Sequence, residues 1–573
     1  MKLFNIFLFL GENDIILLDM GEGGRKMRGI GIGLSDFKEL ITEKSFYVDK
    51  TKFIEDIVKD ITKVQLITRP RRFGKTLNMS MLKYFFDIEN KENNRKLFEG
   101  LYIENSSVIE EQGKYPVIFL SFKDIKADNA EKMFVCIKSV ISDLFEKYKY
   151  IRESLDERNV EIFDRIWKRE EEDYSSSLIF LSKCLKEYYK QDVILLIDEC
   201  DTPMVSAYEG GYYDEVKNFF TGLFGSALKE NPFLKKAVLT GIMRISKENI
   251  FSGLNNVKVN SILEENFAEY FGITEKEVEN SLREYQLEER LPEVQKWYNG
   301  YNFGGVRVYN PFSITNFLDR KRIMPYWVNT SSNSLINKVL REANSLIFDE
   351  LSKLFQRETI NKTIDIYSNF DELKNPEQIW YLLTNAGYLT PVEEVDFGKY
   401  SIKIPNEEVH YFFERDFISN FLGSIDGFDK ALEYLLEGNL EEFSYELENI
   451  MLTNVSCFDF NSSSKESHYH VFILGMLLGL RRKYYVRSNR ESRRGRYDLM
   501  IEPRDKSKEK NALIIELKVA ENEEELVRVS EEALAQIESK KYDVELRDKG
   551  IESIILVGMS FYQRNFKVIG YKK

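Results

Sequence analysis

The sequence contains little cysteine and no long apolar run. Its four cysteines, Cys136, Cys184, Cys200 and Cys457, stand far apart in 573 residues and lack the spacing of a metal-ligand cluster. Scattered cysteines are typical of free thiols in a reducing compartment, so we expect no disulfide framework, no zinc site and a cytoplasmic protein. No apolar run approaches the roughly 18 residues that span a bilayer, and we therefore expect no membrane insertion.

Net positive charge is absent as well. The formal net charge is −14, which excludes a uniformly basic coat for nucleic acid but leaves room for a local basic patch. The chain consists of 43% hydrophobic and 31% charged residues, the composition of a globular protein. Its 573 residues exceed the roughly 100–200 residues of one domain, so two to four domains are expected.

Residues 1–27 are predicted to be a non-native or unstructured leader. Phe4–Leu10 is apolar, but acidic residues follow it without a convincing cleavage site, which disfavours a signal peptide. Residues 21–26 can be back-translated as a purine-rich run that contains a ribosome-binding sequence. We therefore hypothesise that Met27 is the real start, and peptides from residues 1–20 in a mass spectrum would refute this.

A phosphate-binding loop is predicted after the apolar run 64–68. This run enters Arg69-Pro70-Arg71-Arg72-Phe73-Gly74-Lys75-Thr76, and an amphipathic helix with apolar residues at 77, 81, 82, 85 and 86 follows. Backbone N–H groups and a lysine at such a turn bind phosphate, and the threonine hydroxyl can reach Mg²⁺. The usual pattern has a first glycine where this chain has an arginine. The predicted nucleotide-binding residues of the loop are Arg71, Arg72, Phe73, Gly74, Lys75 and Thr76.

A second strand is predicted to complete the nucleotide site. Residues 193–197 form a buried-strand pattern that ends in Asp198 and Glu199. In phosphate-loop enzymes such an acid holds Mg²⁺ and a second carboxylate orients the attacking water, so we assign Asp198 to the metal with Thr76, and Glu199 to catalysis. The alternative is that Asp198 caps the next helix and that Glu199 is solvated.

A third strand, 236–241, carries Thr240 near its end, and Arg244 follows. These residues could sense a γ-phosphate, although a turn at the end of a strand explains them almost as well. We predict ATP and Mg²⁺ as the cofactors of this region, with Thr240 as a binding residue.

The middle of the chain, about 286–435, reads as a helical and possibly winged domain. Two aromatic loops punctuated by glycine or asparagine, 297–305 and 309–313, fall near its start. Packing alone explains them, because aromatic side chains bury large areas and Asn or Gly turns the chain.

A basic segment occurs near the C-terminus, with Tyr484 and Tyr485 inside it. It has one acid, Glu491, and eight basic residues: Arg481, Arg482, Lys483, Arg487, Arg490, Arg493, Arg494 and Arg496. Such a patch suits a phosphate backbone, and a solvated charged loop is the alternative.

Two strands beside this segment carry a second candidate site. Residues 496–501 contain Asp498, and residues 512–519 contain Glu516 and Lys518. Side chains at i and i+2 of a strand share a face, so Glu516 and Lys518 project together and need partners. Hydrolysis of a phosphodiester needs oxygen ligands for Mg²⁺ and a cation near the phosphate. We therefore predict catalytic roles for all three residues and metal binding by the two acids.

Other polar residues could join this second site. Glu466 begins a helical run and could add a metal ligand. His468 and His470 are two residues apart and do not share a helix face, so at most one is expected to be functional. Gln536, in another helical run, could contact the site or lie on a solvated face.

With both sites in view, the chain resembles the bacterial and archaeal AAA-ATPase-like family whose members carry a C-terminal PD-(D/E)XK nuclease-like domain. The resemblance runs nearly end to end from Gly31. Apart from the phosphate loop and the tail residues, its strongest marks are segments 47–51, 196–199, 239–241, 310–313 and 386–390. The resemblance implies that the missing first glycine is shared by the family, so Arg69 is not damage to this copy.

The resemblance implies a multidomain α/β protein. The expected parts are a P-loop NTPase domain with a parallel sheet and flanking helices (28–285), a helical or winged middle (286–435), and a restriction-endonuclease-like α/β domain (436–573). It implies an ATP-binding ATPase coupled to a Mg²⁺-dependent nuclease that acts on nucleic acid, with DNA favoured, in defence or mobile-element control. The alternative is a nucleotide-switched nucleic-acid-binding or signalling protein that does not cut.

Overall fold

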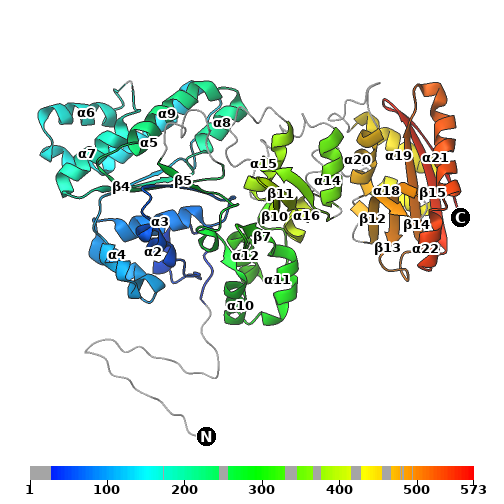
Figure 1. Cartoon of the computed structure of the whole chain (residues 1–573), viewed down its shortest axis with the longest axis horizontal. Coiled ribbons are helices and arrows are strands. Elements are labelled where there is room, and N and C mark those ends of the chain that lie inside the picture. The colour runs from blue at the N-terminus through cyan, green and yellow to red at the C-terminus, as the bar shows by residue number, and fades with distance from the viewer. Residues whose placement is uncertain are drawn as a thin grey trace, which may run out of the picture.

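The computed structural model shows three parts arranged in a row (Figure 1). It describes residues 28–171, 173–243, 256–328, 345–355, 357–364, 376–413, 428–453, 466–477, 479–480, 483–492 and 495–573. The predicted leader, residues 1–27, and Arg244 lie outside this set. Among the described residues, no helix is both long and apolar enough to cross a membrane.

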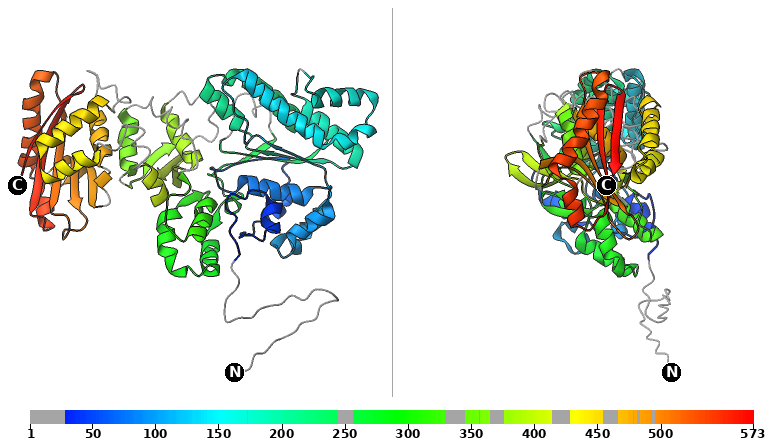
Figure 2. Two further views of the ribbon diagram at one scale, coloured as in Figure 1. Left: turned by 180° about the vertical axis from the view of Figure 1, so that it is seen from behind. Right: turned by 90° about the vertical axis from the view of Figure 1, so that its right-hand side faces the viewer.

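The first part is built on a five-stranded parallel sheet in the order β2-β3-β4-β1-β5. Its strands are β1 (Val64–Thr68), β2 (Val117–Ser121), β3 (Val193–Asp198), β4 (Leu234–Gly241) and β5 (Val257–Asn260). Helices cover both faces of the sheet (Figures 1 and 2). This arrangement confirms the predicted α/β class with a P-loop-like parallel sheet.

The helices of the first part divide between the two faces. After α1 (Phe37–Thr42), one face carries α2 (Lys52–Lys59), α3 (Lys75–Phe86) and α4 (Lys91–Arg95). The opposite face carries α5 (Ala130–Lys147), α6 (Glu157–Trp167), α7 (Ser177–Tyr189), α8 (Thr202–Gly210) and α9 (Tyr213–Leu228).

Alternating side chains build a core on each face of this sheet. Leu195 and Ile197 of β3 pack into the core on one face, whereas Ile194 and Leu196 pack into the core on the other. Successive residues of a strand point to opposite faces, and fully burying one such side chain contributes about 1.5–3 kcal/mol. Because helices cover both faces, the strand is apolar at every position before its terminal acid.

The strand order brings the predicted nucleotide-site residues to one edge. Strand β4 lies between β1 and β3, with Thr68 opposite Gly241 and Ile197 opposite Leu239. The carboxyl ends of parallel strands meet at the same edge of a sheet, where ligands of α/β proteins bind. The loop after β1, the acids after β3 and Thr240 of β4 therefore converge there.

A helical cluster follows the sheet. It contains α10 (Glu275–Glu284), α11 (Leu291–Tyr298), α12 (Pro311–Arg320) and the three strands β6 (Ile273–Thr274), β7 (Tyr301–Phe303) and β8 (Val306–Tyr309). The side chain of Asn310 caps α12 by accepting the N–H groups of Phe312 and Ser313, which explains the motif 310–313. Helix α10 precedes the boundary predicted at 285 yet packs with α11 and α12, and that boundary stays a prediction.

The middle part contains a three-stranded antiparallel sheet in the order β10-β11-β9. Its elements are α14 (Ser345–Phe355), β9 (Ile360–Thr363), α15 (Ile379–Ala386), β10 (Thr390–Asp396), β11 (Lys399–Lys403) and α16 (Glu407–Phe412). The β10–β11 hairpin extends into solvent and ends near Phe397, which is 100% exposed. Every residue of α15 from Ile379 to Asn385 is buried, so this helix has no exposed face with which to read a DNA groove.

The third part has a mixed sheet in the order β12-β13-β14-β15-β16, in which only β14 and β15 run parallel. The strands are β12 (Tyr484–Ser492), β13 (Gly495–Pro503), β14 (Asn511–Val519), β15 (Ser553–Tyr562) and β16 (Asn565–Lys572). The helices are α18 (Phe428–Glu437), α19 (Leu440–Thr453), α20 (Glu466–Leu477), α21 (Leu526–Lys540) and α22 (Asp543–Asp548). Helix α14 of the middle part contacts α20. The boundary predicted at 435 falls within α18, which packs on β14, and it also stays a prediction.

Candidate functional site

The loop between β1 and α3 has the backbone of a phosphate cradle. Arg72 has φ +66° and Gly74 has φ +80°, and α3 begins at Lys75. Positive φ values at alternate residues turn successive N–H groups toward one side, which creates an anion-binding concavity at the start of a helix. Gly74 adopts its positive φ without the steric cost that a Cβ would add.

Lys75 is a buried cation in this loop. Its side chain is 4% exposed, and Nζ donates to the carbonyl oxygens of Arg69 and Pro70, both at 3.0 Å. Burial lowers the pKa of Lys75, and the nearby acids Glu199 and Asp201 oppose this effect. Within the described residues its ammonium forms no ion pair. The site therefore fits an anionic ligand, because a phosphate group would pair directly with an ammonium that bonds only carbonyl oxygens among the described residues.

Asp198 joins three of the predicted residues. Its carboxylate is fully buried and accepts the hydroxyl of Thr76 at 2.8 Å and that of Thr240 at 2.6 Å. Helix α8 begins only at Thr202, after Asp201, so the alternative that Asp198 caps a helix is wrong. Hydroxyl groups from α3 and β4 thus bond the two oxygens of one carboxylate at the end of β3, near the buried lysine.

Glu199 follows Asp198 with φ +50°. A left-handed backbone is uncommon for a non-glycine residue and costs of order 1–3 kcal/mol, and such residues cluster at functional sites. The backbone N–H of Glu199 donates to Oγ1 of Thr240 at 3.3 Å. Burial raises the pKa of the half-buried Glu199, and Lys75 opposes the rise. The predicted catalytic role of Glu199 and the predicted γ-phosphate contact of Thr240 stay predictions.

The three residues before Gly74 contact the middle of the chain. The carbonyl of Arg71 accepts the indole N–H of Trp327 at 3.0 Å, and the guanidinium of Arg72 lies 5.2 Å from the ring centre of Phe312. Phe73 is fully buried and packs edge-on against Tyr301, with ring centres 4.9 Å apart. Only the backbone of Phe73 can therefore serve the predicted nucleotide contact, since its side chain points into the core.

Sequence reasoning missed the role of Arg69. This residue is fully buried, donates to the carbonyl of Asn260 at 2.8 Å, and stacks between Phe271 and Phe303 at 5.5 and 5.3 Å. Burial lowers its pKa to about 9. The arginine in the usual glycine position thus fixes the start of the loop to β5 and its surroundings. The partners lie about 200 residues away, so no local pattern could reveal them.

Asp201 was also missed. It is buried and accepts the N–H groups of Ile242 at 2.7 Å and Met243 at 2.9 Å. Burial raises its pKa. The third acid in the run Asp198-Glu199-Cys200-Asp201 was the available signal for a residue that fixes the end of β4.

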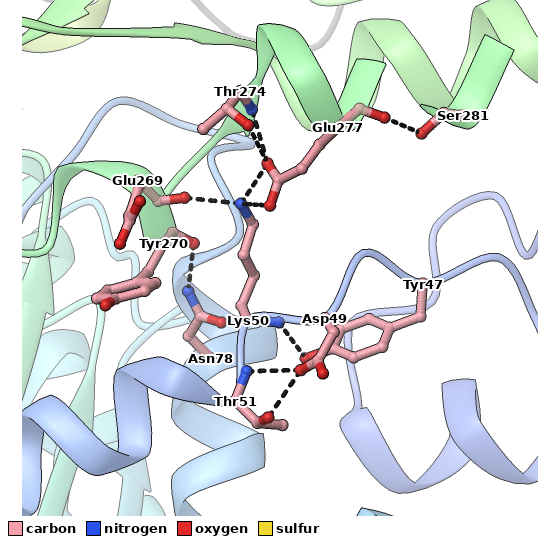
Figure 3. Close-up of polar contacts among 10 residues, drawn as sticks. All are labelled: Tyr47, Asp49, Lys50, Thr51, Asn78, Glu269, Tyr270, Thr274, Glu277 and Ser281. Atoms are coloured by element: carbon pink, nitrogen blue, oxygen red, sulfur yellow. Dashed lines mark hydrogen bonds and ion pairs between the residues drawn. The ribbon is translucent and has the colours of Figure 1, made fainter. Parts of the chain in front are cut away.

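The motif 47–51 forms a polar joint between the first sheet domain and α10 (Figure 3). Nζ of Lys50 bonds both carboxylate oxygens of Glu277, at 2.7 and 2.6 Å, and the carbonyl of Glu269 at 2.7 Å. Glu277 also accepts the N–H of Thr274 at 2.7 Å and so caps α10. This motif therefore has a structural role in the described residues.

The predicted tail acids lie on neighbouring strands. Leu499 of β13 pairs with Ile515 of β14, and this register brings Asp498 next to Glu516. The N–H of Leu517 donates to Asp498 at 2.7 Å, and Glu516 is only 4% exposed. Lys518 is half-buried and lies two residues beyond Glu516, on the same face of β14. The sequence prediction of a shared location for these three residues agrees with this geometry.

Gln536 of α21 bonds Glu516, and Tyr542, which follows this helix, lies nearby. The side-chain amide of Gln536 donates to Glu516, so the alternative of a solvated Gln536 is wrong. Tyr542 is 2% exposed and packs edge-on against Tyr497 at 5.8 Å. Burial raises the pKa of Tyr542, and the nearby Glu516 adds to the rise. Tyr542 was not predicted, because nothing in its local sequence separates it from an ordinary core tyrosine.

Helix α20 lies next to Asp498 through His470. His470 is 4% exposed, and its Nε2 lies 3.3 Å from the carbonyl oxygen of Asp498. Glu466 is the first residue of α20, but its side chain and that of His468 lie outside the described residues. Among the residues described, no three His, Cys, Asp or Glu side chains group together as a metal site, so metal binding at Glu466, Asp498 and Glu516 stays a prediction.

The predicted basic patch is only partly described. Lys483 pairs with Glu509 at 3.3 Å, and Arg487 pairs with Glu502 at 2.9 Å and Glu545 at 3.1 Å. The side chains of Arg481, Arg482, Arg490, Arg493, Arg494 and Arg496 lie outside the described residues. The two described members are therefore engaged in ion pairs, and the phosphate contact of the patch stays a prediction.

A buried carboxylate in the middle part should make stability depend on pH. Burial raises the pKa of Glu408 to about 7, opposed by hydrogen bonds from Ser313 and from the backbone of Trp327, while Tyr298 and Tyr301 lie nearby. Because the folded state keeps this proton above the ordinary pKa of 4.5, the stabilisation is present at low pH and is lost as pH rises to about 7. Between pH 5 and 8 the loss should be about 2.5 kcal/mol.

Urea unfolding of the native protein and of Glu408→Gln checks this. The free energy of unfolding of the native protein, relative to that of the variant, should fall by about 2.5 kcal/mol from pH 5 to pH 8. Glu407→Gln, one residue earlier on α16, controls for loss of a carboxylate from the same helix. A difference between the native protein and Glu408→Gln that stays constant over this range would refute the assignment.

Two family models match this chain, one near each end. Residues 31–251 match the family described as predicted AAA-ATPase, and residues 464–570 match the PD-(D/E)XK nuclease superfamily. A protein described as "Uncharacterized protein in vnfD 5'region", from Azotobacter chroococcum mcd 1, is 25% identical over 383 residues, which cover 66% of this chain and 67% of that relative. Both matched ranges lie within the longer parts that were predicted for these domains, 28–285 and 436–573, and the bounds of those parts stay predictions.

Proposed function

We propose that this chain, an AAA-ATPase-like protein with a C-terminal domain of the PD-(D/E)XK nuclease superfamily, binds ATP and Mg²⁺ at the loop after β1 and cuts nucleic acid with its tail. The observation that carries the proposal is that Asp198 accepts hydrogen bonds from Thr76 and Thr240 near the buried Lys75, whose ammonium bonds only carbonyl oxygens among the described residues. We further propose DNA as the substrate, a cytoplasmic location in a bacterial cell, and a role in defence or mobile-element control.

At the nucleotide site each residue has a distinct task. Lys75 and the N–H groups at the start of α3 would bind the phosphates, and Thr76 with Asp198 would hold Mg²⁺, which offsets phosphate charge when bound. Glu199 lies next to Asp198 and would orient and deprotonate the attacking water. Burial raises its pKa, which makes the carboxylate a stronger base than an exposed glutamate. Thr240 positions both acids through its hydroxyl group.

At the tail site the two carboxylates and the lysine act on the phosphodiester. Asp498 and Glu516 would hold Mg²⁺, which supplies charge stabilisation when bound, and Gln536 fixes the orientation of Glu516. Lys518 would place a positive charge beside the phosphate and orient water. Superfamily membership supports a nucleic-acid substrate for this domain.

A cleavage assay tests the proposal. Purified protein is incubated with single-stranded and double-stranded DNA and RNA, with and without ATP, Mg²⁺ and Mn²⁺, and ATP binding is measured in parallel. We expect ATP binding and metal-dependent cutting of DNA. Nucleic-acid binding that is independent of metal and never followed by cutting would instead establish the alternative, a nucleotide-switched binding or signalling protein.

A further inference from the structure

The phosphate loop is bound to the rest of the chain at nearly every residue. Pro70 faces Gly387, the Arg71 carbonyl accepts from Trp327, and the Arg72 guanidinium lies over Phe312. None of these partners belongs to the parallel sheet. They come from α12, from the segment after α12 and from the end of α15. The shape of the loop is therefore imposed by residues from 240 to more than 300 positions further along the chain.

Trp327 is the most constrained of these partners. It is 2% exposed, its indole N–H donates to the Arg71 carbonyl at 3.0 Å, and its backbone N–H donates to Glu408 at 2.6 Å. The other carboxylate oxygen of Glu408 accepts the hydroxyl of Ser313 at 2.7 Å. One buried carboxylate thus holds both Trp327 and the helix that carries Phe312, the partner of Arg72.

The hydrogen bond from Trp327 determines the direction of an N–H group in the cradle. A peptide unit is planar, and its carbonyl and N–H point to opposite sides. Holding the Arg71 carbonyl therefore fixes the N–H of Arg72, the residue whose φ of +66° gives the loop its concave form. Without this bond the peptide could rotate, and the concavity would lose one of its fixed donors.

We propose that Trp327 is a positioning residue of the nucleotide site: through the Arg71 carbonyl it holds the loop in the form that binds the phosphates of ATP. This inference rests on the proposed nucleotide function. It assigns to the middle of the chain a residue that the ATP site requires, and it explains how a loop without its first glycine keeps a fixed shape.

Two tryptophan variants test the proposal. Trp327→Phe keeps an aromatic ring but removes the N–H donor. Trp380→Phe is the matched control, because Trp380 is 1% exposed and its indole N–H has no hydrogen-bond partner in the described structure. The affinity for ATP with Mg²⁺, measured by titration calorimetry, should fall about tenfold in Trp327→Phe and change less than twofold in Trp380→Phe.

A glycine pair provides an independent test if Trp327→Phe fails to fold. Gly387 has φ +89° and Gly398 has φ +68°, so alanine strains the backbone at both positions. A Cβ at 387 would lie 2.9 Å from Pro70 and 3.3 Å from Trp327, whereas one at 398 would meet nothing within 4 Å. Gly387→Ala should weaken ATP binding about tenfold, and Gly398→Ala should leave it unchanged.

The outcomes separate this inference from the function on which it rests. If the native protein does not bind ATP, the proposed function itself is wrong. If it binds ATP, and Trp327→Phe matches Trp380→Phe while Gly387→Ala matches Gly398→Ala, the nucleotide function stands and the positioning role is overturned. The positioning role is supported if Trp327→Phe loses affinity for ATP, Trp380→Phe does not, and the two variants unfold at the same temperature. If Trp327 were purely structural, Trp327→Phe would instead unfold at a lower temperature without a specific loss of ATP affinity.

Discussion

Lys75→Met is expected to abolish nucleotide binding while the ligand-free protein stays folded. The ammonium of Lys75 is buried and bonds only carbonyl oxygens among the described residues, at 3.0 Å. Removing it takes away the full positive charge that would face the phosphates, and charge-assisted hydrogen bonds of this kind support a loss of affinity of about a hundredfold. Methionine fills a similar volume, but it leaves the carbonyls of Arg69 and Pro70 and the nearby buried acids without the ammonium, so the thermal midpoint without ATP should fall modestly. Binding is therefore compared at temperatures well below both midpoints.

The matched control lies on the same helix. Lys83→Met makes the same exchange on α3, where the ammonium lies 4.8 Å from the ring centre of Tyr84. ATP binding by calorimetry and the shift of the thermal midpoint with ATP should both vanish in Lys75→Met and persist in Lys83→Met. Retention of tight ATP binding by Lys75→Met would remove Lys75 from the nucleotide site.

Lys518→Met is expected to abolish cleavage while ATP binding and folding persist. Lys518 lies on the same face of β14 as Glu516, and it is half-buried, so its charge acts in a partly water-excluded site. Losing a positioned cation that stabilises charge in the transition state costs about a hundredfold to a thousandfold in rate. The rate of cutting of a labelled DNA in Mg²⁺ should fall by that factor.

A second lysine in the same sheet domain controls for loss of general positive charge. Lys567 lies on β16 and is exposed, opposite Ser560 of β15. Lys567→Met should therefore cut DNA at nearly the native rate. Equal activity of Lys518→Met and Lys567→Met, with both proteins folded, would mean that the tail lysine takes no part in the reaction.

The sequence predicted those parts of the molecule whose signals are local. A strand followed by Gly74, Lys75 and Thr76, and a second strand ending in Asp198, specified both elements and the edge at which they meet. The structure then adds the hydrogen bonds of Asp198 with Thr76 and Thr240. Strand patterns likewise predicted β13 and β14, because the i, i+2 spacing of Glu516 and Lys518 is itself a local signal.

Contacts between distant segments could not be predicted in this way. Arg69 stood in the position of a missing glycine, but its partner Asn260 lies on β5 and only tertiary structure brings the two together. The indole of Trp327 and the carbonyl of Arg71 are 256 residues apart. The sequence predicted that the aromatic loops near 301 and 312 serve packing, and they do pack. Their partners, however, include Arg72 and Phe73 of the phosphate loop, which the sequence did not indicate.

The middle part does not present the surface that a DNA-reading winged domain needs. A winged domain is often considered as a DNA reader, but α15 is buried and the hairpin near Phe397 carries the acids Glu393, Glu394 and Asp396 in exposed positions. Acidic residues repel a phosphate backbone. We therefore expect the middle part to connect the two sites, through α14 and α20, and the tail domain to hold the nucleic acid.

The rate of DNA cutting in Mg²⁺, measured with and without ATP, tests the central claim most directly. The two domains act together if ATP changes the rate in the native protein and in Lys83→Met, while Lys75→Met shows the same rate with and without ATP. We predict that pattern, with cutting by Lys518→Met about a hundredfold to a thousandfold slower than that of the native protein under every condition. Cutting by the native protein that is identical with and without ATP, in a preparation shown to bind ATP, would contradict the account.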